Sequence, residues 1–199
     1  MLVRKYLSTF AQNNHTLRRW IYGLGRVRSE GMYGFVKLYL KQGDRILDIG
    51  SGTCNMVELI VDDGFKVVPL DVEDLSFVDG IRPLIYNGGR IPFGNKEFDT
   101  ALILTVLHHT PDPEKILREA SRVAKRIIIM EDVYDSVLMK WATFLMDSVV
   151  NFEFFGHPHS NKSDFEWKET FKKLKLKLVH ARYSMFWGIF RSATYCVIH

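Results

Sequence analysis

Cysteine is scarce in this chain of 199 residues: Cys54 and Cys196 are the only two, and they lie far apart in the sequence. Two such residues indicate neither a disulfide framework nor a paired zinc site of the Cys-x-x-Cys kind. No metal is therefore predicted. A reducing compartment is the default for such a chain, so we expect a cytoplasmic protein.

Long apolar runs are also missing. The first residues, Met1 to Lys5, are not followed by the apolar core of a secretory signal. The most apolar stretch, residues 137–150, is interrupted by Lys140 and Asp147. It falls short of the roughly 20 residues that a helix needs to span a bilayer. Neither export nor a membrane span is predicted.

Proline and glycine are few, with 6 and 14 residues, while 47% of the chain is hydrophobic and 25% is charged. This composition excludes disordered and fibrous classes and suffices for one continuous core. We predict a single globular domain over residues 1–199.

The net charge of +4 is distributed unevenly. Residues 1–41 hold eight Lys or Arg and only one acidic residue, Glu30, and aromatic side chains are interleaved with them. Such a segment could dock on nucleic acid or on an anionic lipid surface. The alternative is a pair of amphipathic helices whose arginines are simply solvated. The sequence leaves both interpretations open.

Strand and helix patterns alternate along most of the chain. Apolar positions recur at helical spacing within residues 1–41, and residues 98–104 have the continuous apolar character of a buried parallel strand. Alternation of this kind builds a doubly wound, mostly parallel sheet, with a ligand crevice at the carboxyl ends of its strands. Further strands are expected at 45–49, 66–71, 81–86, 126–131, 174–183 and 193–198, and further helices at 55–64, 113–120, 136–152 and 163–173.

A glycine-rich loop follows the first of these strands, with the sequence DIGSGTCN over residues 48–55. Glycines allow a tight turn and a close approach of backbone N–H groups to a ligand. A dinucleotide site usually has a third glycine at the place of Asn55, which disfavours an oxidoreductase that uses NAD or FAD. Asp71, which ends the next strand, can accept hydrogen bonds from both hydroxyls of an adenosine ribose.

Four ordered segments together resemble one family, the class I (Rossmann-like) S-adenosylmethionine-dependent methyltransferases of the small-molecule type. The resemblance spans about residues 45–132. It implies a seven-stranded sheet with an antiparallel C-terminal strand and N-terminal helices, and S-adenosylmethionine as cofactor. The segments that carry it are residues 47–53, Asp71, residues 87–93, and residues 98–123 with the histidine pair at 108–109.

The resemblance also implies roles for individual residues. Asp48 would orient the loop and the methionine end of the cofactor, the backbone of Gly50, Ser51 and Gly52 would lie against it, and Asp71 would hold the ribose. The adenine edge and the methionine side of the pocket would be lined by Asn87, Gly88, Leu104, Thr105 and His108. Two departures from the family pattern, Cys54 and a shortened turn at 124–126, remove no contact group.

No catalytic base can be assigned, because methyl transfer from a sulfonium needs mainly alignment and exclusion of water. The candidates are His108, His109, Glu131, His157 and His159, with Asp132 as a further carboxylate near a strand end. Each could instead be a hydrogen-bonded wall or a helix cap. The His157-x-His159 pair lacks a third metal ligand, so a substrate-facing loop or a surface turn is expected there.

The acceptor is predicted to be small and hydrophobic, because the helix expected within residues 134–151 has only one narrow polar stripe. That helix could equally be packed between other elements. We divide the domain into an N-terminal helical cap (1–41), a cofactor-binding core (42–132), a helical acceptor lid (133–173) and C-terminal strands (174–199).

Two rival functions remain. The first is an RNA or protein methyltransferase that docks through the basic N-terminal segment; the N-P-P-Y motif of many such enzymes is absent, and residues 104–107 occupy its place, so a nucleic-acid partner is not expected. The second is a non-catalytic partner subunit with the same fold. Peripheral membrane contact through the N-terminal helices is a further hypothesis.

Overall fold

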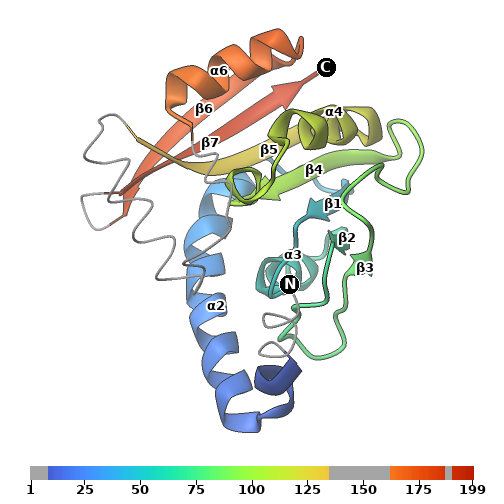
Figure 1. Cartoon of the computed structure of the whole chain (residues 1–199), viewed down its shortest axis with the longest axis vertical. Helices are drawn as coiled ribbons and strands as arrows, with labels where there is room; N and C mark the ends of the chain where they lie inside the picture. The colour runs from blue at the N-terminus through green and yellow to red at the C-terminus, as the bar shows by residue number, and fades with distance from the viewer. Residues whose placement is uncertain (1–8, 135–161, 187–189) are drawn as a thin grey trace. The chain divides into compact units, whose positions relative to one another are not determined.

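The structure is a computed structural model and describes residues 9–134, 162–186 and 190–199. Its strands are β1 (Arg45–Ile49), β2 (Lys66–Asp71), β3 (Leu84–Ile85), β4 (Phe98–Leu104), β5 (Ala124–Val133), β6 (Lys177–Phe186) and β7 (Phe190–Ile198). They follow the order β3-β2-β1-β4-β5-β7-β6 in one sheet (Figure 1). The predicted doubly wound, mostly parallel seven-stranded sheet is confirmed. The chain forms two compact units, Met1–Pro92 and Phe93–His199.

The first unit is built on three parallel strands. β1 pairs with β2 in the register Arg45↔Lys66 to Ile49↔Leu70, and β2 pairs with β3 through Leu70↔Leu84. β1 is buried after its first residue, as expected for a strand with covered faces. The carboxyl ends of β1 and β2 therefore meet at the glycine-rich loop.

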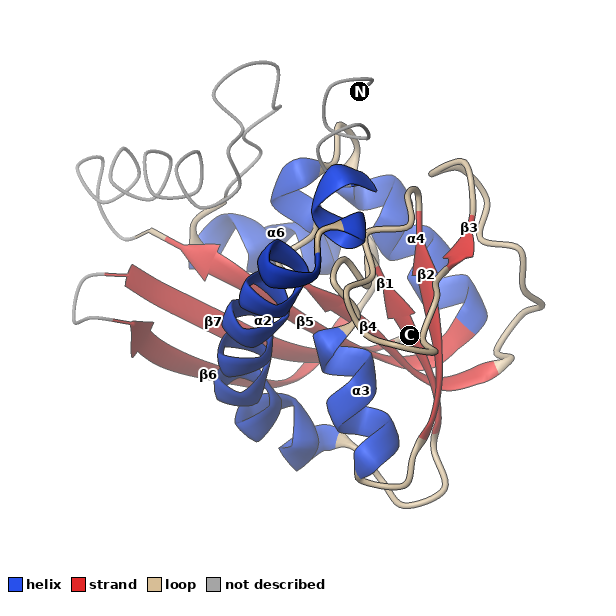
Figure 2. Ribbon diagram, turned by 90° about the horizontal axis from the view of Figure 1, so that it is seen from below, coloured by secondary structure: helices blue, strands red, loops and turns tan. Residues whose placement is uncertain are grey.

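Two helices of the first unit, α2 (His15–Val36) and α3 (Asn55–Asp62), lie side by side (Figures 1 and 2). Asn14 caps α2, because its side chain accepts a hydrogen bond from the backbone N–H of Leu17 at 3.0 Å. The helix is then fixed by polar contacts to α3 and to the loop after β2. Apolar packing continues at Cys54, Val57 and Val78, with Tyr22 of α2 against them.

Gly25 lies where α2 passes closest to the start of α3. A Cβ at this position would stand 3.1 Å from Cγ of Asn55, closer still to its Oδ1, and 3.3 Å from Oγ1 of Thr53. Asn55 is buried, so its side chain has little room to retreat. Glycine at this position of the helix is therefore a packing requirement.

We expect Gly25→Ala to lower the free energy of unfolding by about 1–2 kcal/mol, because the clash outweighs the helix propensity that alanine adds. Gly23→Ala in the same helix is the matched control, since a Cβ there would meet nothing within 4 Å. It should raise the free energy of unfolding by about 0.5–1 kcal/mol. Urea denaturation measures both variants, and equal stabilisation by the two would contradict the close approach.

The second unit combines parallel and antiparallel strands. β4 and β5 are parallel, β7 pairs with β5 in the antiparallel sense, and β6 pairs with β7. The predicted antiparallel strand at the C-terminus is thus confirmed. Helix α4 (Pro113–Val123) begins at the cap Asp112 with proline in its first turn, and it buries Ile116 and Leu117.

Helix α6 (Asp164–Lys173) covers the same face of the second unit's strands as α4 (Figures 1 and 2). It starts with a capping box in which Ser163 and Glu166 satisfy each other's backbone N–H groups. Trp167, Phe171 and Tyr195 form an aromatic core, with ring centroids 6.2 Å and 5.2 Å apart in turn.

Two expectations for the secondary structure differ from the observed one. The strand predicted at 81–86 is only Leu84–Ile85, because Pro83 has a fixed φ and no N–H for the ladder. The long N-terminal helix ends at Val36 and is followed by a 3-10 turn, Lys37–Tyr39. The helix predicted at 136–152 lies outside the described residues. Among the described helices, none has the length and apolar character required to cross a membrane.

Candidate cofactor site

The loop after β1 turns on two glycines in the left-handed region, Gly50 with φ 77° and Gly52 with φ 52°. The N–H groups of Gly50 and Ser51 both donate to the carbonyl of Leu70, at 2.8 and 3.2 Å. Both N–H groups are thus bonded within the protein, and the contact of the loop backbone with a ligand stays a prediction. What the glycines provide is space: a Cβ on Gly52 would meet nothing closer than 4.0 Å.

Asp71 closes the loop from the end of β2. Its Oδ2 accepts a hydrogen bond from the N–H of Gly52 at 2.8 Å, and its Oδ1 accepts one from the N–H of Val72 at 2.6 Å. Oδ1 also accepts a longer bond from the N–H of Glu73 at 3.4 Å, so the lone pair left for a further donor is on Oδ2. The side chain thus orders the loop and can also accept a hydroxyl group of a ligand.

Asp48 places a second carboxylate beside this loop. It is buried, and burial, followed by the charge of Asp71, raises its pKa to about 7. Two neighbouring carboxylates favour a ligand that carries positive charge and hydroxyl groups, and they disfavour a pyrophosphate. The donor set therefore suits S-adenosylmethionine better than a dinucleotide.

This shift makes stability depend on pH in a defined direction. Because the pKa of Asp48 is higher in the folded state than its ordinary value of 3.8, the folded protein holds a proton that the unfolded chain releases, so stability falls as pH rises from about 4 to about 7. We expect Asp48→Asn, which cannot titrate, to weaken this fall markedly. Urea denaturation at pH 5 and pH 7.5, without cofactor, compares the two proteins. If the free energy of unfolding changed equally with pH in both proteins, the raised pKa of Asp48 would be refuted.

The start of α3 carries contacts that the sequence did not reveal. Cys54 precedes the helix with φ 61°, and Asn55 replaces the third glycine of the dinucleotide pattern. Nδ2 of Asn55 donates to the carbonyl of Tyr22 at 3.4 Å, while its Oδ1 is buried without a partner among the described residues. The sequence showed Asn55 only as a missing glycine, because its neighbour Gly25 is distant along the chain.

Asn87 and Gly88 lie in the loop after β3. The side chain of Asn87 is exposed, and its Oδ1 accepts a hydrogen bond from the N–H of Gly89 at 2.9 Å. Gly88 has φ 73° and lies near the side chain of Val72. In this structure Asn87 shapes its own turn, and a contact with adenine stays a prediction.

In the second unit, β4 ends at a backbone turn centred on Thr105. Leu104 is buried, and Thr105 has φ 56°, a left-handed conformation that is unusual for a β-branched residue. The N–H of Thr105 donates to the carbonyl of Met130 in β5 at 2.7 Å. Neighbouring β5 therefore holds this strained turn in place.

The side chain of Glu131 in β5 also supports the turn that follows β4. Its Oε1 accepts hydrogen bonds from the N–H groups of Val106 and Leu107, at 2.9 and 2.8 Å. Its Oε2 lies 2.5 Å from Nδ1 of His108, and both side chains are buried. His108 and Glu131, two of the candidates for a catalytic base, thus form one buried pair in the second unit.

The other candidates have different surroundings. The ring of His109 is tilted against that of His108, with centroids 4.0 Å apart, and is only partly buried. Asp132 follows Glu131 on β5 and is also partly buried. His157 and His159 lie outside the described residues. Among the candidates that the structure describes, His108 and Glu131 are the two that are both buried and hydrogen-bonded to each other.

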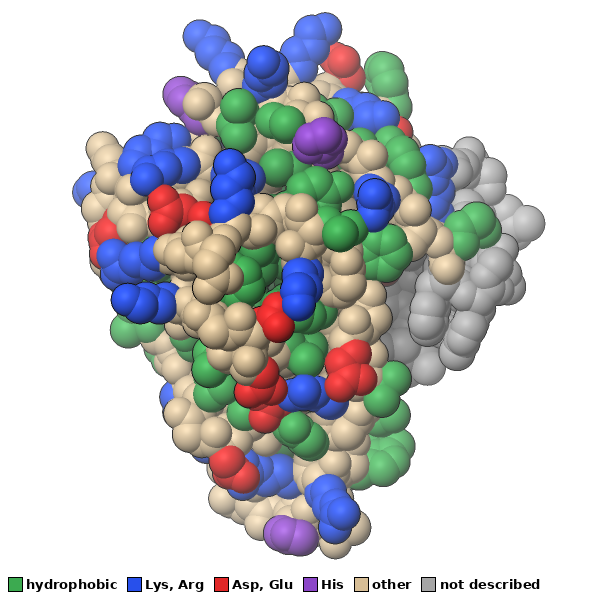
Figure 3. Space-filling view, turned by 180° about the vertical axis from the view of Figure 1, so that it is seen from behind, with side chains coloured by type: hydrophobic (Ala, Val, Ile, Leu, Met, Phe, Trp, Pro, Cys, Tyr) green, Lys and Arg blue, Asp and Glu red, His purple; other side chains and the backbone are tan. Residues whose placement is uncertain are grey.

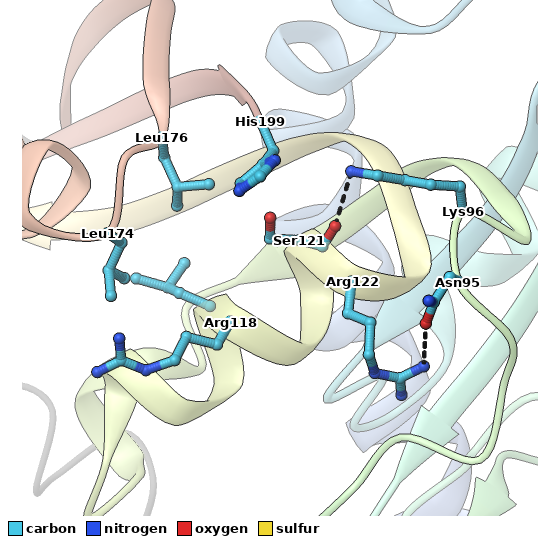
Figure 4. Close-up of a pocket in the computed structure, with 9 residues that line it drawn as sticks. Asn95, Lys96, Arg118, Ser121, Arg122, Leu174, Leu176 and His199 are labelled. Atoms are coloured by element: carbon cyan, nitrogen blue, oxygen red, sulfur yellow. Dashed lines mark hydrogen bonds between the residues drawn. The ribbon is translucent and has the colours of Figure 1, made fainter.

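A cavity of about 420 Å³ lies elsewhere in the second unit (Figure 4). Lys96, Arg122 and His199 are among the residues that line it, and none of the predicted cofactor residues is. Nζ of Lys96 donates to the carbonyls of Ser121 and Ala124, at 2.9 and 3.1 Å, so this cation ties down the end of α4. The cavity is not part of the candidate site.

Comparisons with known proteins agree with this geometry. Residues 47–127 match the family described as "Methyltransferase domain". An uncharacterised protein of Methanocaldococcus jannaschii is 33% identical over 96 residues, covering 46% of this chain and 44% of that protein. The demethylmenaquinone methyltransferase of Renibacterium salmoninarum is 30% identical over 95 residues, covering 42% and 38%. The matches thus span less than half of these curated relatives.

A solved structure shares the fold. The crystal structure of a SAM-dependent methyltransferase from Methanosarcina mazei superimposes with a TM-score of 0.66 at 18% identity, over 82% of this chain and 96% of that one. Sequence match, strand order and loop geometry point the same way. Residues 47–127 are thus similar to methyltransferase domains, and the chain shares the fold of a SAM-dependent methyltransferase.

Proposed function

We propose that this protein transfers a methyl group from S-adenosylmethionine to a small, apolar acceptor. The observation that carries the proposal is the arrangement of Asp48 and Asp71 around the open space over Gly52. When bound, S-adenosylmethionine supplies a methyl group on a sulfonium that is already a good leaving group. The protein then has mainly to align the reactants and exclude water.

Different residues of the first unit would bind different parts of the cofactor. In the proposal, Asp71 accepts a ribose hydroxyl on the lone pair of Oδ2 that its bond to Gly52 leaves free. Asp48 faces the ammonium group of the methionine end, which favours its ionised form. The backbone at Gly50 and Gly52 lets the cofactor lie close to the chain.

We propose that the buried pair of His108 and Glu131 in the second unit removes a proton from the acceptor. A carboxylate on Nδ1 of His108 favours the tautomer with the proton on that nitrogen, which leaves the lone pair on Nε2. His108 would accept a proton from the acceptor through Nε2. Glu131 would act as a positioning residue, since it holds both the imidazole and the N–H groups of Val106 and Leu107.

Two observations support a small apolar acceptor over a macromolecule. A relative is named for its action on demethylmenaquinone, a hydrophobic quinone. The charge of the basic N-terminal segment is also partly neutralised, because three of its eight cations pair with acidic residues of the same unit: Arg18 with Asp79, Arg26 with Glu58, and Lys37 with Asp63. Cations held in this way contribute less to docking on phosphates.

Calorimetric titration with S-adenosylhomocysteine, with NADH as the control ligand, tests the cofactor. Binding of the first alone is expected. A folded sample that binds neither would overturn the enzyme proposal and favour the non-catalytic subunit.

The acceptor is tested separately with radiolabelled S-adenosylmethionine. Incorporation is compared between a prenylated naphthohydroquinone and total RNA. Label in the organic extract supports the proposal. Label only in RNA would contradict it and would indicate an RNA methyltransferase.

A further inference from the structure

One face of α2 exposes large apolar side chains. Trp20, Leu24 and Val27 are 63%, 55% and 70% exposed, and their spacing of four and three residues places them in one stripe along the helix. Gly31 continues this stripe by one turn and is also exposed. Single exposed apolar residues are ordinary, but an aligned row of three on one helix marks an interaction surface.

The opposite face of α2 is fixed to the rest of its unit, so the stripe cannot turn inward. The hydroxyl of Tyr22 donates to Glu58 at 2.9 Å, Arg26 donates to the same carboxylate at 2.6 Å, and the hydroxyl of Tyr33 donates to Asp63 at 2.7 Å. These bonds lie along most of the helix. Packing at Gly25 adds a close approach that any rotation of α2 would break.

Cationic side chains flank the stripe. Arg19 and Arg28 are exposed, and helical geometry places them on opposite sides of the row that Trp20 and Leu24 define. The exposed surface of α2 holds one acidic residue, Glu30, and this carboxylate accepts a hydrogen bond from Arg26 at 3.0 Å. An apolar row between arginines matches the boundary between acyl chains and anionic headgroups.

We infer that α2 docks on an anionic lipid surface, with Trp20, Leu24 and Val27 at the acyl boundary and Arg19 and Arg28 on lipid phosphates. A second copy of the chain is the alternative occupant of this face that the experiment has to exclude. Figure 3 shows basic and acidic side chains close to one another on the face seen from behind. The inference is independent of the acceptor.

Vesicle co-sedimentation of the full chain tests this inference. We expect binding to phosphatidylcholine vesicles that contain phosphatidylglycerol, and at least tenfold weaker binding to phosphatidylcholine alone. Leu24→Ser with Val27→Ser should weaken binding to the anionic vesicles at least tenfold. Arg19→Glu with Arg28→Glu should do the same and should also remove the salt dependence.

Val61→Ser is the matched control, because Val61 is a similarly exposed apolar residue on α3 of the same unit, 48% exposed. It should bind like the unchanged protein. Circular dichroism and urea midpoints verify that the variants are folded. Failure of the unchanged protein to bind anionic vesicles would overturn the inference. So would equal loss in the control, or a self-association of the free protein that Leu24→Ser abolishes.

Discussion

Replacement of Glu131 by alanine should lower the free energy of unfolding by about 3–5 kcal/mol. The carboxylate is the acceptor for the N–H groups of Val106 and Leu107 and lies against Nδ1 of His108, all in a buried position. Alanine would leave these donors without a partner and away from water. Urea denaturation monitored by fluorescence measures the loss.

Glu131→Gln separates the support of the turn from the action on histidine. The glutamine carbonyl can still accept the two backbone bonds, so we expect a loss of only about 1 kcal/mol. Its amide would face Nδ1 of His108 as a donor and invert the tautomer. Nitrogen NMR of labelled histidine detects that change, which a purely structural role for Glu131 would not produce.

Glu169→Ala serves as the control for loss of a glutamate in the same unit. Glu169 is 54% exposed in its side chain and stands 3.9 Å from Lys172, so the change should cost less than about 0.5 kcal/mol. A similar cost for Glu131→Ala would contradict the role given to the buried pair.

Replacement of Asp71 by alanine should weaken the binding of S-adenosylhomocysteine by about 100-fold or more. The variant loses the proposed acceptor of the ribose hydroxyls, and it also releases the N–H of Gly52, whose bond to Asp71 orders the loop. Asp71→Asn retains one carbonyl acceptor and should have an intermediate affinity. Calorimetry of the three proteins gives the dissociation constants.

Asp62→Asn is the control for the change in charge. Asp62 lies at the end of α3 in the same unit, and its carboxylate is 3.5 Å from Arg26. The affinity of the Asp62→Asn variant for S-adenosylhomocysteine should match that of the unchanged protein. An Asp71→Ala variant that is folded and binds as tightly as this control would remove Asp71 from the site.

The fold could be predicted in large part because its signals are local. Apolar runs at 45–49 and 98–104 become β1 and β4 over the same residues, whereas the strand expected at 81–86 is reduced to Leu84–Ile85 after Pro83. The match of residues 47–127 to a methyltransferase domain agrees with the predicted resemblance, because the motif order is a property of the chain itself. The division into cap, core, lid and C-terminal strands stays a prediction.

The site was predicted less completely. Asp48, Gly52 and Asp71 lie together as expected, because a strand, a turn and a strand end bring them together over a short stretch of chain, and their contact with a cofactor stays a prediction. The use of the loop N–H groups by Leu70 was missed, because a backbone acceptor leaves no mark in the sequence. The left-handed Thr105 was missed for a related reason, since side-chain type argues against that conformation.

What the sequence determined by itself is the alternation of elements, the turn at Gly50 and Gly52, and the carboxylate at the end of β2, all of which follow from side-chain periodicity and backbone freedom over a few residues. Tertiary structure alone decided which distant groups meet: Glu131 with His108, Gly25 with Asn55, and the arginines of α2 with their carboxylates. These contacts join residues more than 20 positions apart, and their energies depend on burial and orientation, which arise only when the elements pack.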